Sequence, residues 1–406
     1  MPKCRICQSE YRPFMSFGKM PIANGFLRED EFENEHFFEL AVAFCENCKM
    51  VQLIEQPPRE KMFNENYPFF SSTSEEMAIH FKEFADHVIN KYFISKDPFV
   101  IEIGSNDGIL LQHFASENIR HLGIEPSANV AEIAIKKGIN SVCNFFDEEL
   151  ANEIARKYGL ADIFLGANVM CHIPNLHSVI NGIDILLKKS GFMIFEDPYL
   201  CDVIKKTSYD QFYDEHVFLF SVSSISYLFE QHNMEVIDLE PQWTHGGSMR
   251  YIIARKGMAK ISKNVLRFIK KEKALGIHKL DVYDKFRRNC KKSRDLLVSL
   301  LYEKKKQGKN IVGYAATSKS TTILNYCGIS TDLIDYISDT TPIKQGKFSP
   351  GTHIPIRPYE EFLLNYPDYA VLFAYNHAKE IMSKEKKFIE SGGKWIVYVP
   401  KVNILE

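Results

Sequence analysis

The amino-acid sequence predicts an α/β protein with a small metal-binding unit at the N-terminus, a central parallel-sheet domain and a second α/β domain at the C-terminus. Three observations lead to this prediction. Two Cys-x-x-Cys pairs lie before residue 50. From residue 99 onward, short apolar runs that end at small or acidic residues alternate with helical patterns, as in parallel sheets covered by helices. The same alternation restarts after Gly308.

Composition and charge exclude several kinds of partner. The chain has 50 Lys and Arg against 52 Asp and Glu, a net charge of -2, so no basic excess points to nucleic acid or to an anionic membrane. No apolar run approaches the roughly 18 residues of a membrane span, and the N-terminus lacks the apolar core of a signal peptide. We therefore expect a cytoplasmic protein that acts as a monomer, without nucleic acid or membrane partners.

The two cysteine pairs predict a structural zinc ion. Cys4 and Cys7 form one pair, and Cys45 and Cys48 form the other. Four thiolates complete a tetrahedral zinc site and leave no open position for catalysis. A redox dithiol or two chance pairs are the alternatives, but two matched pairs favour a metal over either. The metal would stabilise a segment that is too short to build a large core of its own.

Helical and strand patterns follow in order along the central part of the chain. A helical pattern covers residues 75–93, and a buried strand covers residues 99–104. Further strands are predicted at residues 121–125, 163–166 and 192–196, with helical stretches between them. This order of strand and helix is typical of a parallel sheet.

The last part of the chain repeats the pattern after a charged connection. Residues 260–306 are rich in Lys, Arg and Leu at helical spacing, which predicts one or two helices with a solvated face. Strands are then predicted at residues 310–314, 333–337, 369–374 and 395–399. The expected divisions of the chain are residues 1–66, 67–258, 259–306 and 307–406.

A turn and an acidic residue in the central domain predict a nucleoside site. The turn follows a buried strand and opens a helix, where small residues let the backbone approach a ligand. An acid suited to the two ribose hydroxyls ends the next strand, at about the spacing of nucleoside-binding sheets. The predicted site residues are Glu102, Gly104, Ser105, Asn106, Asp107 and Gly108 of the turn, together with Glu125 and Pro126.

Both dinucleotide enzymes and S-adenosylmethionine-dependent methyltransferases have this layout. The acids at 102 and 107 would repel a diphosphate, whereas they suit the cationic methionine part of S-adenosylmethionine. An ordinary turn between strand and helix is the alternative. The spacing to Glu125 favours a nucleoside ligand.

Several short motifs then resemble one enzyme family when they are taken in order. They are Glu-Ile-Gly-Ser-Asn-Asp-Gly at 102–108, Gly-Ile-Glu-Pro-Ser at 123–127, Tyr213-Asp214-Glu215-His216, His245-Gly246-Gly247-Ser248, Asn325-Tyr326-Cys327-Gly328 and Gly351-Thr352-His353-Ile354-Pro355. In this order, after paired Cys-x-x-Cys motifs, the chain resembles the nucleotide-sugar C-methyltransferases that make branched deoxysugars. The resemblance runs from Cys4 to about Pro400.

The resemblance implies a zinc-binding N-terminal domain, a central class I methyltransferase domain with a Rossmann-like sheet, and a C-terminal Rossmann-like domain, with the sugar between the last two. Members methylate a carbon beside the C4 ketone of a sugar linked to a nucleoside diphosphate. The motif residues carried over are Tyr213, Glu215 and His216 as catalytic, and Tyr67, Asn168, His172 and Lys319 as substrate-binding. Ser320 replaces the usual glycine after the lysine, and Met170-Cys171 also departs from the pattern.

The chemistry implied by the family needs a base and a group that stabilises an enolate. We expect His216 to be the base, with Glu215 orienting the imidazole and Tyr213 donating a hydrogen bond to the enolate. The alternative is that His216 only caps a turn, and His172 and His245 are equally compatible with structural roles. Methylation of a sugar oxygen, and a non-catalytic zinc-ribbon adaptor that binds nucleoside, are the alternative functions.

Overall fold

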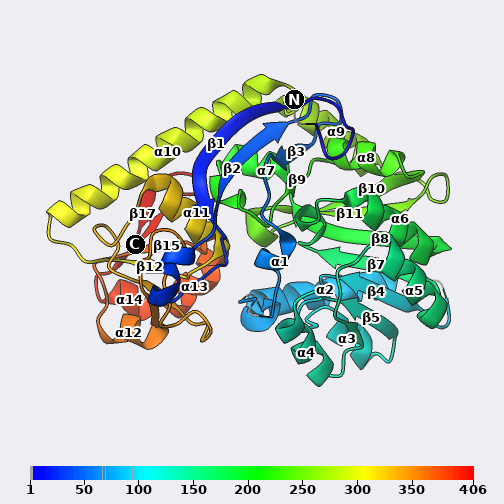
Figure 1. Cartoon of the computed structure of the whole chain (residues 1–406), viewed down its shortest axis with the longest axis horizontal. Coiled ribbons are helices and arrows are strands. Elements are labelled where there is room, and N and C mark those ends of the chain that lie inside the picture. Colours follow the sequence, from blue (N-terminus) through cyan, green and yellow to red (C-terminus); the bar gives the residue numbers. More distant parts are fainter. Residues whose placement is uncertain (1–2, 66, 69, 94) are drawn as a thin grey trace.

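The computed structural model describes residues 3–65, 67–68, 70–93 and 95–406 and contains sheets of four, seven and six strands. In Figure 1 the central domain lies at the right and the C-terminal domain at the left, with β1 and β2 near the top between them. The mixed α/β architecture confirms the predicted fold class.

The N-terminal sheet is antiparallel and takes one strand from the central part of the chain. Its order is β1 (Arg12–Pro21), β2 (Phe37–Phe44), β3 (Val51–Leu53) and β9 (Phe218–Leu219), and the short helix α1 (Arg59–Met62) follows β3. Val51 pairs with Leu219, and Gln52 pairs with Phe218. The expected division at residue 66 therefore separates strands that share one sheet. The segment that ends at His216 leads directly into β9, so the N-terminal sheet helps to fix its position.

The two cysteine pairs form two matching turns. In each turn the residue after the second cysteine is left-handed, with φ 58° at Gln8 and 63° at Lys49, and its amide donates to the carbonyl of the first cysteine at 3.0 and 2.9 Å. Cys4 Sγ lies 3.5 Å from Cys48 Sγ, and Cys7 Sγ lies 3.4 Å from Cys45 Sγ. All four sulfurs are within 4.8 Å of one another. Four convergent thiolates are the donor set that zinc requires.

The central sheet has the order β10-β11-β8-β7-β4-β5-β6, and β11 runs antiparallel to both of its neighbours, while the other strands are parallel to one another. The strand β4 is buried at every residue, as its Phe-Val-Ile-Glu-Ile sequence predicts for a middle strand. The strands are β4 (Phe99–Ile103), β5 (Arg120–Ile124), β6 (Ser141–Val142), β7 (Ala161–Ala167), β8 (Leu187–Pro198), β10 (Met234–Gln242) and β11 (Ser248–Arg255). The helices are α2 (Glu75–Tyr92), α3 (Leu111–Ser116), α4 (Ala128–Lys136), α5 (Glu148–Tyr158), α6 (Leu176–Leu186), α7 (Leu200–Lys206) and α8 (Val222–Glu230).

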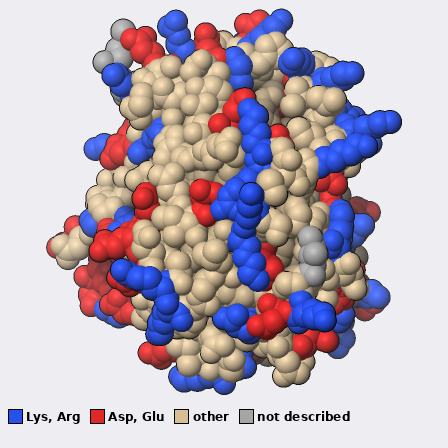
Figure 2. Space-filling view, turned by 90° about the vertical axis from the view of Figure 1, so that its right-hand side faces the viewer, with Lys and Arg blue, Asp and Glu red and all other residues tan. Residues whose placement is uncertain are grey.

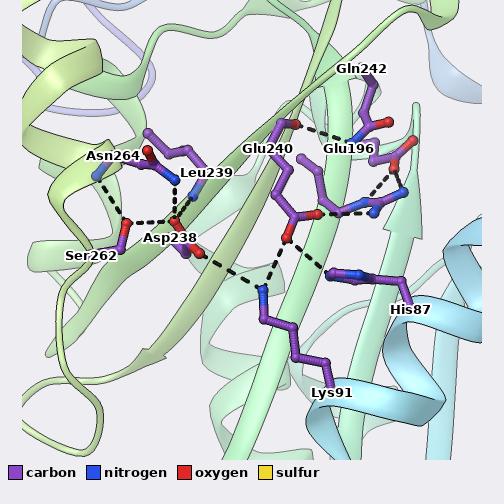
Figure 3. Close-up of polar contacts among 10 residues, drawn as sticks. His87, Lys91, Glu196, Asp238, Leu239, Glu240, Gln242, Ser262 and Asn264 are labelled. Atoms are coloured by element: carbon purple, nitrogen blue, oxygen red, sulfur yellow. Dashed lines mark hydrogen bonds and ion pairs between the residues drawn. The ribbon is translucent and has the colours of Figure 1, made fainter.

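Charged side chains tie α2 to the antiparallel side of this sheet. Arg250 of β11 donates from Nε to Glu196 Oε1 of β8 at 2.6 Å and from an NH group to Glu240 Oε2 of β10 at 3.1 Å. His80 of α2 meets Glu196 Oε2 at 2.7 Å. Figure 3 shows Lys91 of α2 pointing at Glu240, where their nitrogen and oxygen are 3.1 Å apart. Because these charges are buried or half-buried and paired, they fix the position of α2 on the sheet.

Two helices lead into the C-terminal domain, α9 (Lys263–Leu275) and α10 (Leu280–Lys306), and α10 crosses the top of Figure 1 toward that domain. The C-terminal sheet has the order β14-β13-β12-β15-β16-β17. Its strands are β12 (Ile311–Tyr314), β13 (Ile337–Asp339), β14 (Ile356–Pro358), β15 (Tyr369–Leu372), β16 (Lys394–Val397) and β17 (Asn403–Leu405). Its helices are α11 (Ser318–Cys327), α12 (Tyr359–Leu364), α13 (Ala378–Lys384) and α14 (Lys386–Glu390).

One predicted strand of this domain is mostly a turn. The amides of Leu333 and Ile334 both donate to the carbonyl of Ser330, at 3.0 and 3.1 Å, so the chain curls there instead of extending. Both side chains are buried, which explains the apolar run. The strand begins only at Ile337. The prediction of a strand at residues 333–337 was therefore wrong for all but its last residue, because burial alone does not distinguish a turn from a strand.

Both parallel sheets have a point where the strand order reverses. In the central sheet β4 lies between β5 and β7, and in the C-terminal sheet β12 lies between β13 and β15. Ligands of such sheets bind outside the carboxyl ends of the strands at that point. We therefore expect ligands at the loops that follow β4 and β7 in one domain, and β12 and β15 in the other.

No helix among the described residues is long and apolar enough to cross a membrane. On the face drawn in Figure 2, basic and acidic side chains both occur over the surface, with uncharged residues between them.

The four cysteines of these turns can be tested as zinc ligands by measuring the zinc content of the protein. Purified protein should contain one zinc ion per chain, and Cys48→Ser should lose most of it, because a structural site depends on all four thiolates and binds with roughly 10–16 kcal/mol in zinc-finger peptides. Cys143→Ser is the matched control, since that thiol is exposed and free. Elemental analysis of the three proteins measures the effect. Equal zinc content in the Cys48→Ser protein and the wild type would contradict the assignment.

Candidate functional site

A cavity of about 430 Å³ lies between the central and C-terminal domains. The loops that follow β4, β5 and β7 line it from one side, and the loops that follow β12, β13 and β15 line it from the other. The N-terminal part of the chain contributes Asn24 and Tyr67. The two switch points thus open onto the same space.

Glu125 forms a carboxylate cradle on the central side. Its Oε2 accepts the amide of Asn106 at 3.0 Å, and its Oε1 accepts the amide of Ser127 at 2.9 Å. Burial raises the pKa of the Glu125 carboxyl, while these amide hydrogen bonds act in the opposite direction. Each oxygen keeps a lone pair for another donor, as a pair of ribose hydroxyls requires. Phe145 and Phe146 line the same part of the cavity and offer a surface for a flat base.

The predicted donor residues divide into two groups. Gly104, Asn106, Glu125 and Pro126 line the cavity, whereas Glu102, Ser105, Asp107 and Gly108 lie behind it. Behind the loop, Asp107 accepts the hydroxyl of Ser72, and Lys137 Nζ lies 3.3 Å from its carboxylate. Burial raises the pKa of Glu102 well above its usual value. These four residues shape the turn from behind.

A second cradle with the same hydrogen-bond pattern lies across the cavity. Asp339 at the end of β13 accepts the amide of Ala316 at Oδ2 and the amide of Thr341 at Oδ1, each at 2.7 Å. One amide comes from the loop after the first strand and the other from two residues further on, as at Glu125. The sequence analysis missed Asp339. The signal that could have identified it is the order of strand, small-residue loop, helix, strand and acid, which occurs in both domains.

Lys319 lies in the first turn of α11, beside this second cradle. Thr317 caps α11 by accepting the amide of Ser320 at 3.1 Å, which sets Lys319 in the first turn. Lys319 lines the cavity and is 9% exposed. Burial lowers the pKa of its ammonium group, and the nearby Asp210 and Glu215 oppose that shift. A cation at a helix N-terminus favours an anionic ligand.

Tyr213 and Glu215 project into the cavity from the segment before β9. Glu215 Oε1 accepts from Asn24 Nδ2 at 2.6 Å, and Glu215 Oε2 accepts from Tyr67 Oη at 3.1 Å. Burial raises the pKa of Glu215, although both hydrogen bonds act against the shift. Asn24 was missed by the sequence analysis, because nothing in the sequence relates it to a residue so far along the chain. Asn66 and Phe69, which flank Tyr67 in its motif, lie outside the described residues.

His216 lies behind Tyr213 and does not line the cavity. Its Nδ1 lies 2.8 Å from the carbonyl of Gln211, so this nitrogen carries the proton and donates. Its Nε2 lies 2.6 Å from Tyr213 Oη, which then donates to it. Burial lowers the pKa of His216 well below its usual value, so the ring is neutral near pH 7. The tyrosine and histidine form a hydrogen-bonded pair that meets the cavity through the tyrosine oxygen.

Asn168 and His172 follow β7 at the other side of the switch point and line the cavity. Asn168 has a left-handed backbone with φ 53°. Its Oδ1 and His172 Nε2 are buried and make no hydrogen bond to any described residue. Burial lowers the pKa of His172 to about 3, so this ring is also neutral. Two unpaired buried polar atoms on residues that line a cavity are candidates for hydrogen bonds to a ligand.

His245 also lines the cavity, with a left-handed backbone of φ 54°. The glycines that follow it allow close contacts with the protein itself. A side chain at Gly247 would clash with Asp202, and a Cβ at Gly246 would lie 3.2 Å from Tyr375 Oη. These two glycines therefore allow close contacts with neighbouring helix and loop residues.

Family models match three consecutive parts of the chain: "Putative zinc binding domain" at residues 4–63, "Methyltransferase domain" at 77–239 and "C-methyltransferase C-terminal domain" at 243–400. The chain is similar to the C-methyltransferase NovU of Streptomyces niveus, with 32% identity over 407 residues that cover 99% of this chain and 96% of NovU.

Two solved structures are each similar to less than half of the chain. A SAM-dependent methyltransferase of Anabaena variabilis has 19% identity over 44% of this chain and 86% of its own, with a TM-score of 0.35. The magnesium protoporphyrin IX methyltransferase of Synechocystis, with bound S-adenosylhomocysteine, has 13% identity over 44% of this chain and 83% of its own, also with a TM-score of 0.35. The matched family models and the similarity to NovU along the whole chain confirm the resemblance seen in the sequence: the chain belongs to the C-methyltransferase family and is an S-adenosylmethionine-dependent C-methyltransferase with a zinc-binding N-terminal domain.

Proposed function

We propose that this C-methyltransferase acts on a carbon next to the C4 ketone of a sugar linked to a nucleoside diphosphate. The observation that carries the proposal is the pair of carboxylate cradles, at Glu125 and at Asp339, on opposite sides of one cavity. A methyl donor that contains a nucleoside needs one cradle, and a second nucleoside-linked molecule fits the other. Family membership selects carbon as the methyl acceptor, which disfavours the sugar oxygen methyltransferase and the non-catalytic adaptor.

The C-terminal side of the cavity suits the nucleoside diphosphate. Asp339 would accept from a hydroxyl of the pentose, and Lys319 with the first turn of α11 would attract the diphosphate. Lys344 Nζ donates to the carbonyl of Ala316 at 2.7 Å and so holds the loop that leads into α11. The 4-keto sugar then extends toward Tyr213 and His172, which line the same cavity.

The Tyr213–His216 pair supplies the base that removes the hydrogen next to the ketone. The substrate C–H proton passes to Tyr213 Oη as the tyrosine proton passes to His216 Nε2, and the C–H electron pair enters the enolate. The carbonyl of Gln211 accepts from His216 Nδ1 and stabilises the imidazolium that forms. Because burial keeps the pKa of His216 low, the ring is neutral throughout the neutral range and Nε2 carries no proton when the substrate binds.

Neutral donors stabilise the enolate oxygen as charge develops. His172 lines the cavity and its Nε2 makes no hydrogen bond to any described residue, so the neutral ring would donate from that nitrogen to the enolate oxygen. Glu215, held by Asn24 and Tyr67, orients Tyr67 toward the same region. The bound donor supplies an electrophilic sulfonium methyl group. The enclosed site excludes water from the enolate.

Glu125 generates a test of donor binding. Glu125→Ala should weaken the binding of S-adenosylmethionine by about 1.5–3 kcal/mol, or roughly 10- to 150-fold, because the ribose hydroxyls lose a charged acceptor. Glu132→Ala on the exposed face of α4 is the matched control. Isothermal calorimetry on the zinc-loaded proteins measures the effect. Equal donor affinities in the Glu125→Ala protein and the wild type would place the donor elsewhere.

The proposed role of Tyr213 and His216 as the base can be tested by hydrogen exchange. With S-adenosylhomocysteine present, the wild type should exchange the hydrogen next to the ketone with solvent deuterium. His216→Asn and Tyr213→Phe should each lower exchange and methyl transfer together by about 10²- to 10⁴-fold, since each breaks the proton path. Exchange is followed by NMR and methyl transfer by mass spectrometry.

Tyr302→Phe on the exposed surface of α10 is the control for the exchange test, and calorimetry should find donor binding intact in all three variants. If exchange persists in the Tyr213→Phe protein but not in the His216→Asn protein, His216 removes the substrate proton directly, without the tyrosine. Exchange that persists in both would assign the base to another cavity residue, with His172 or Tyr67 next in order.

A further inference from the structure

Three metal-ligating side chains meet at the rim of the cavity, away from the cysteines and from the proposed base. Glu76 lies in the first turn of α2, His377 follows β15, and Glu380 lies in the first turn of α13. Their ligand atoms are all within 4.8 Å of one another. One of the three therefore comes from the central domain and two come from the C-terminal domain.

The distances leave Nδ1 of His377 without a hydrogen bond to any described residue. Its Nδ1 is buried and lies 3.7 Å from Glu76 Oε2 and 3.6 Å from Glu380 Oε2. A hydrogen bond between nitrogen and oxygen is about 2.7–3.2 Å long, so both distances are too great. Burial lowers the pKa of His377, which leaves the neutral ring as a possible electron-pair donor. Two carboxylates therefore face each other across an unpaired imidazole nitrogen.

A neighbouring hydroxyl orients this group in the way that outer residues orient metal ligands. Ser74 caps α2 by accepting the amide of Met77 at 3.3 Å, and its hydroxyl donates to Glu380 Oε2 at 3.1 Å. The glutamate of one domain is thus held by the helix cap of the other. Hydrogen bonds of this kind to a ligating carboxylate fix its direction and its basicity.

We infer that Glu76, His377 and Glu380 form a binding site for a first-row divalent metal ion that links the central and C-terminal domains. One imidazole and two carboxylates are a mixed nitrogen and oxygen donor set, which suits manganese or iron and differs from the sulfur set of the cysteines. Metal–ligand distances near 2.1 Å would draw the three atoms together by only a small movement. His377 and Glu380 line the cavity, so the coordination positions left open face it.

A manganese titration of the full chain tests the site, with zinc retained at the cysteines. Wild-type protein should bind one Mn²⁺ ion, seen as loss of the free Mn²⁺ signal in electron paramagnetic resonance. Glu380→Gln and His377→Ala should each weaken that binding by at least about tenfold, because each removes one ligand. Glu83→Gln, at an exposed position of α2, should bind as the wild type does.

Thermal unfolding gives a second readout that does not depend on activity. Saturating Mn²⁺ should raise the unfolding temperature of the wild type and of Glu83→Gln, and it should leave Glu380→Gln unchanged, since a ligand stabilises only the state that binds it. Circular dichroism checks that the variants are folded. Absence of bound Mn²⁺ in the wild type at millimolar concentration, or equal binding in the wild type and in the Glu380→Gln protein, would overturn the inference.

Discussion

The structure depends on one constraint: two parallel sheets must present the carboxyl ends of their middle strands to a single cavity. In each sheet the loop after the first strand curls so that its amide reaches an acid at the end of the next strand, Glu125 in one domain and Asp339 in the other. The N-terminal sheet maintains this arrangement. It shares β9 with the segment that carries Tyr213, and Thr321 of α11 donates to the carbonyl of Ala23 at 2.8 Å. Zinc at the cysteines therefore supports the active site from a distance.

The second feature is that polar groups in the cavity wall and directly behind it are buried, and only some of them are paired. Burial lowers the pKa values of His172 and His216 and raises that of Glu215, so neutral forms that are rare at a protein surface are favoured here. Neutral imidazoles can both accept a proton and donate a hydrogen bond. A hydrogen on the carbon next to a ketone is only weakly acidic. Removal of that proton needs such groups held in place without water. The burial that destabilises charges in the free protein thus suits the site to the enolate chemistry that we propose.

The sequence predicted the elements whose signals are local, and it failed where distant contacts decide. The turn at 102–108 and Glu125 could be placed because strand, turn and acid follow each other closely. The orientation of the His216 ring could not be predicted from the sequence, because it is set by hydrogen bonds to the carbonyl of Gln211 and to Tyr213 Oη. Asn24 reaches Glu215 only because the N-terminal sheet folds against both domains. The contribution of β9 to the N-terminal sheet was not visible for the same reason, because this strand comes from a remote part of the chain.

The central claim is that the methyl group is placed on a carbon beside the ketone of a nucleotide-linked sugar, and its most direct test is the position of the methyl group in the product. The zinc-loaded enzyme is incubated with ¹³C-methyl S-adenosylmethionine and a panel of nucleoside-diphosphate 4-keto sugars, and the products are examined by NMR. The account predicts a labelled methyl that couples to a ring carbon adjacent to C4. A labelled methyl on oxygen, or no transfer to any nucleotide-linked keto sugar, would contradict it.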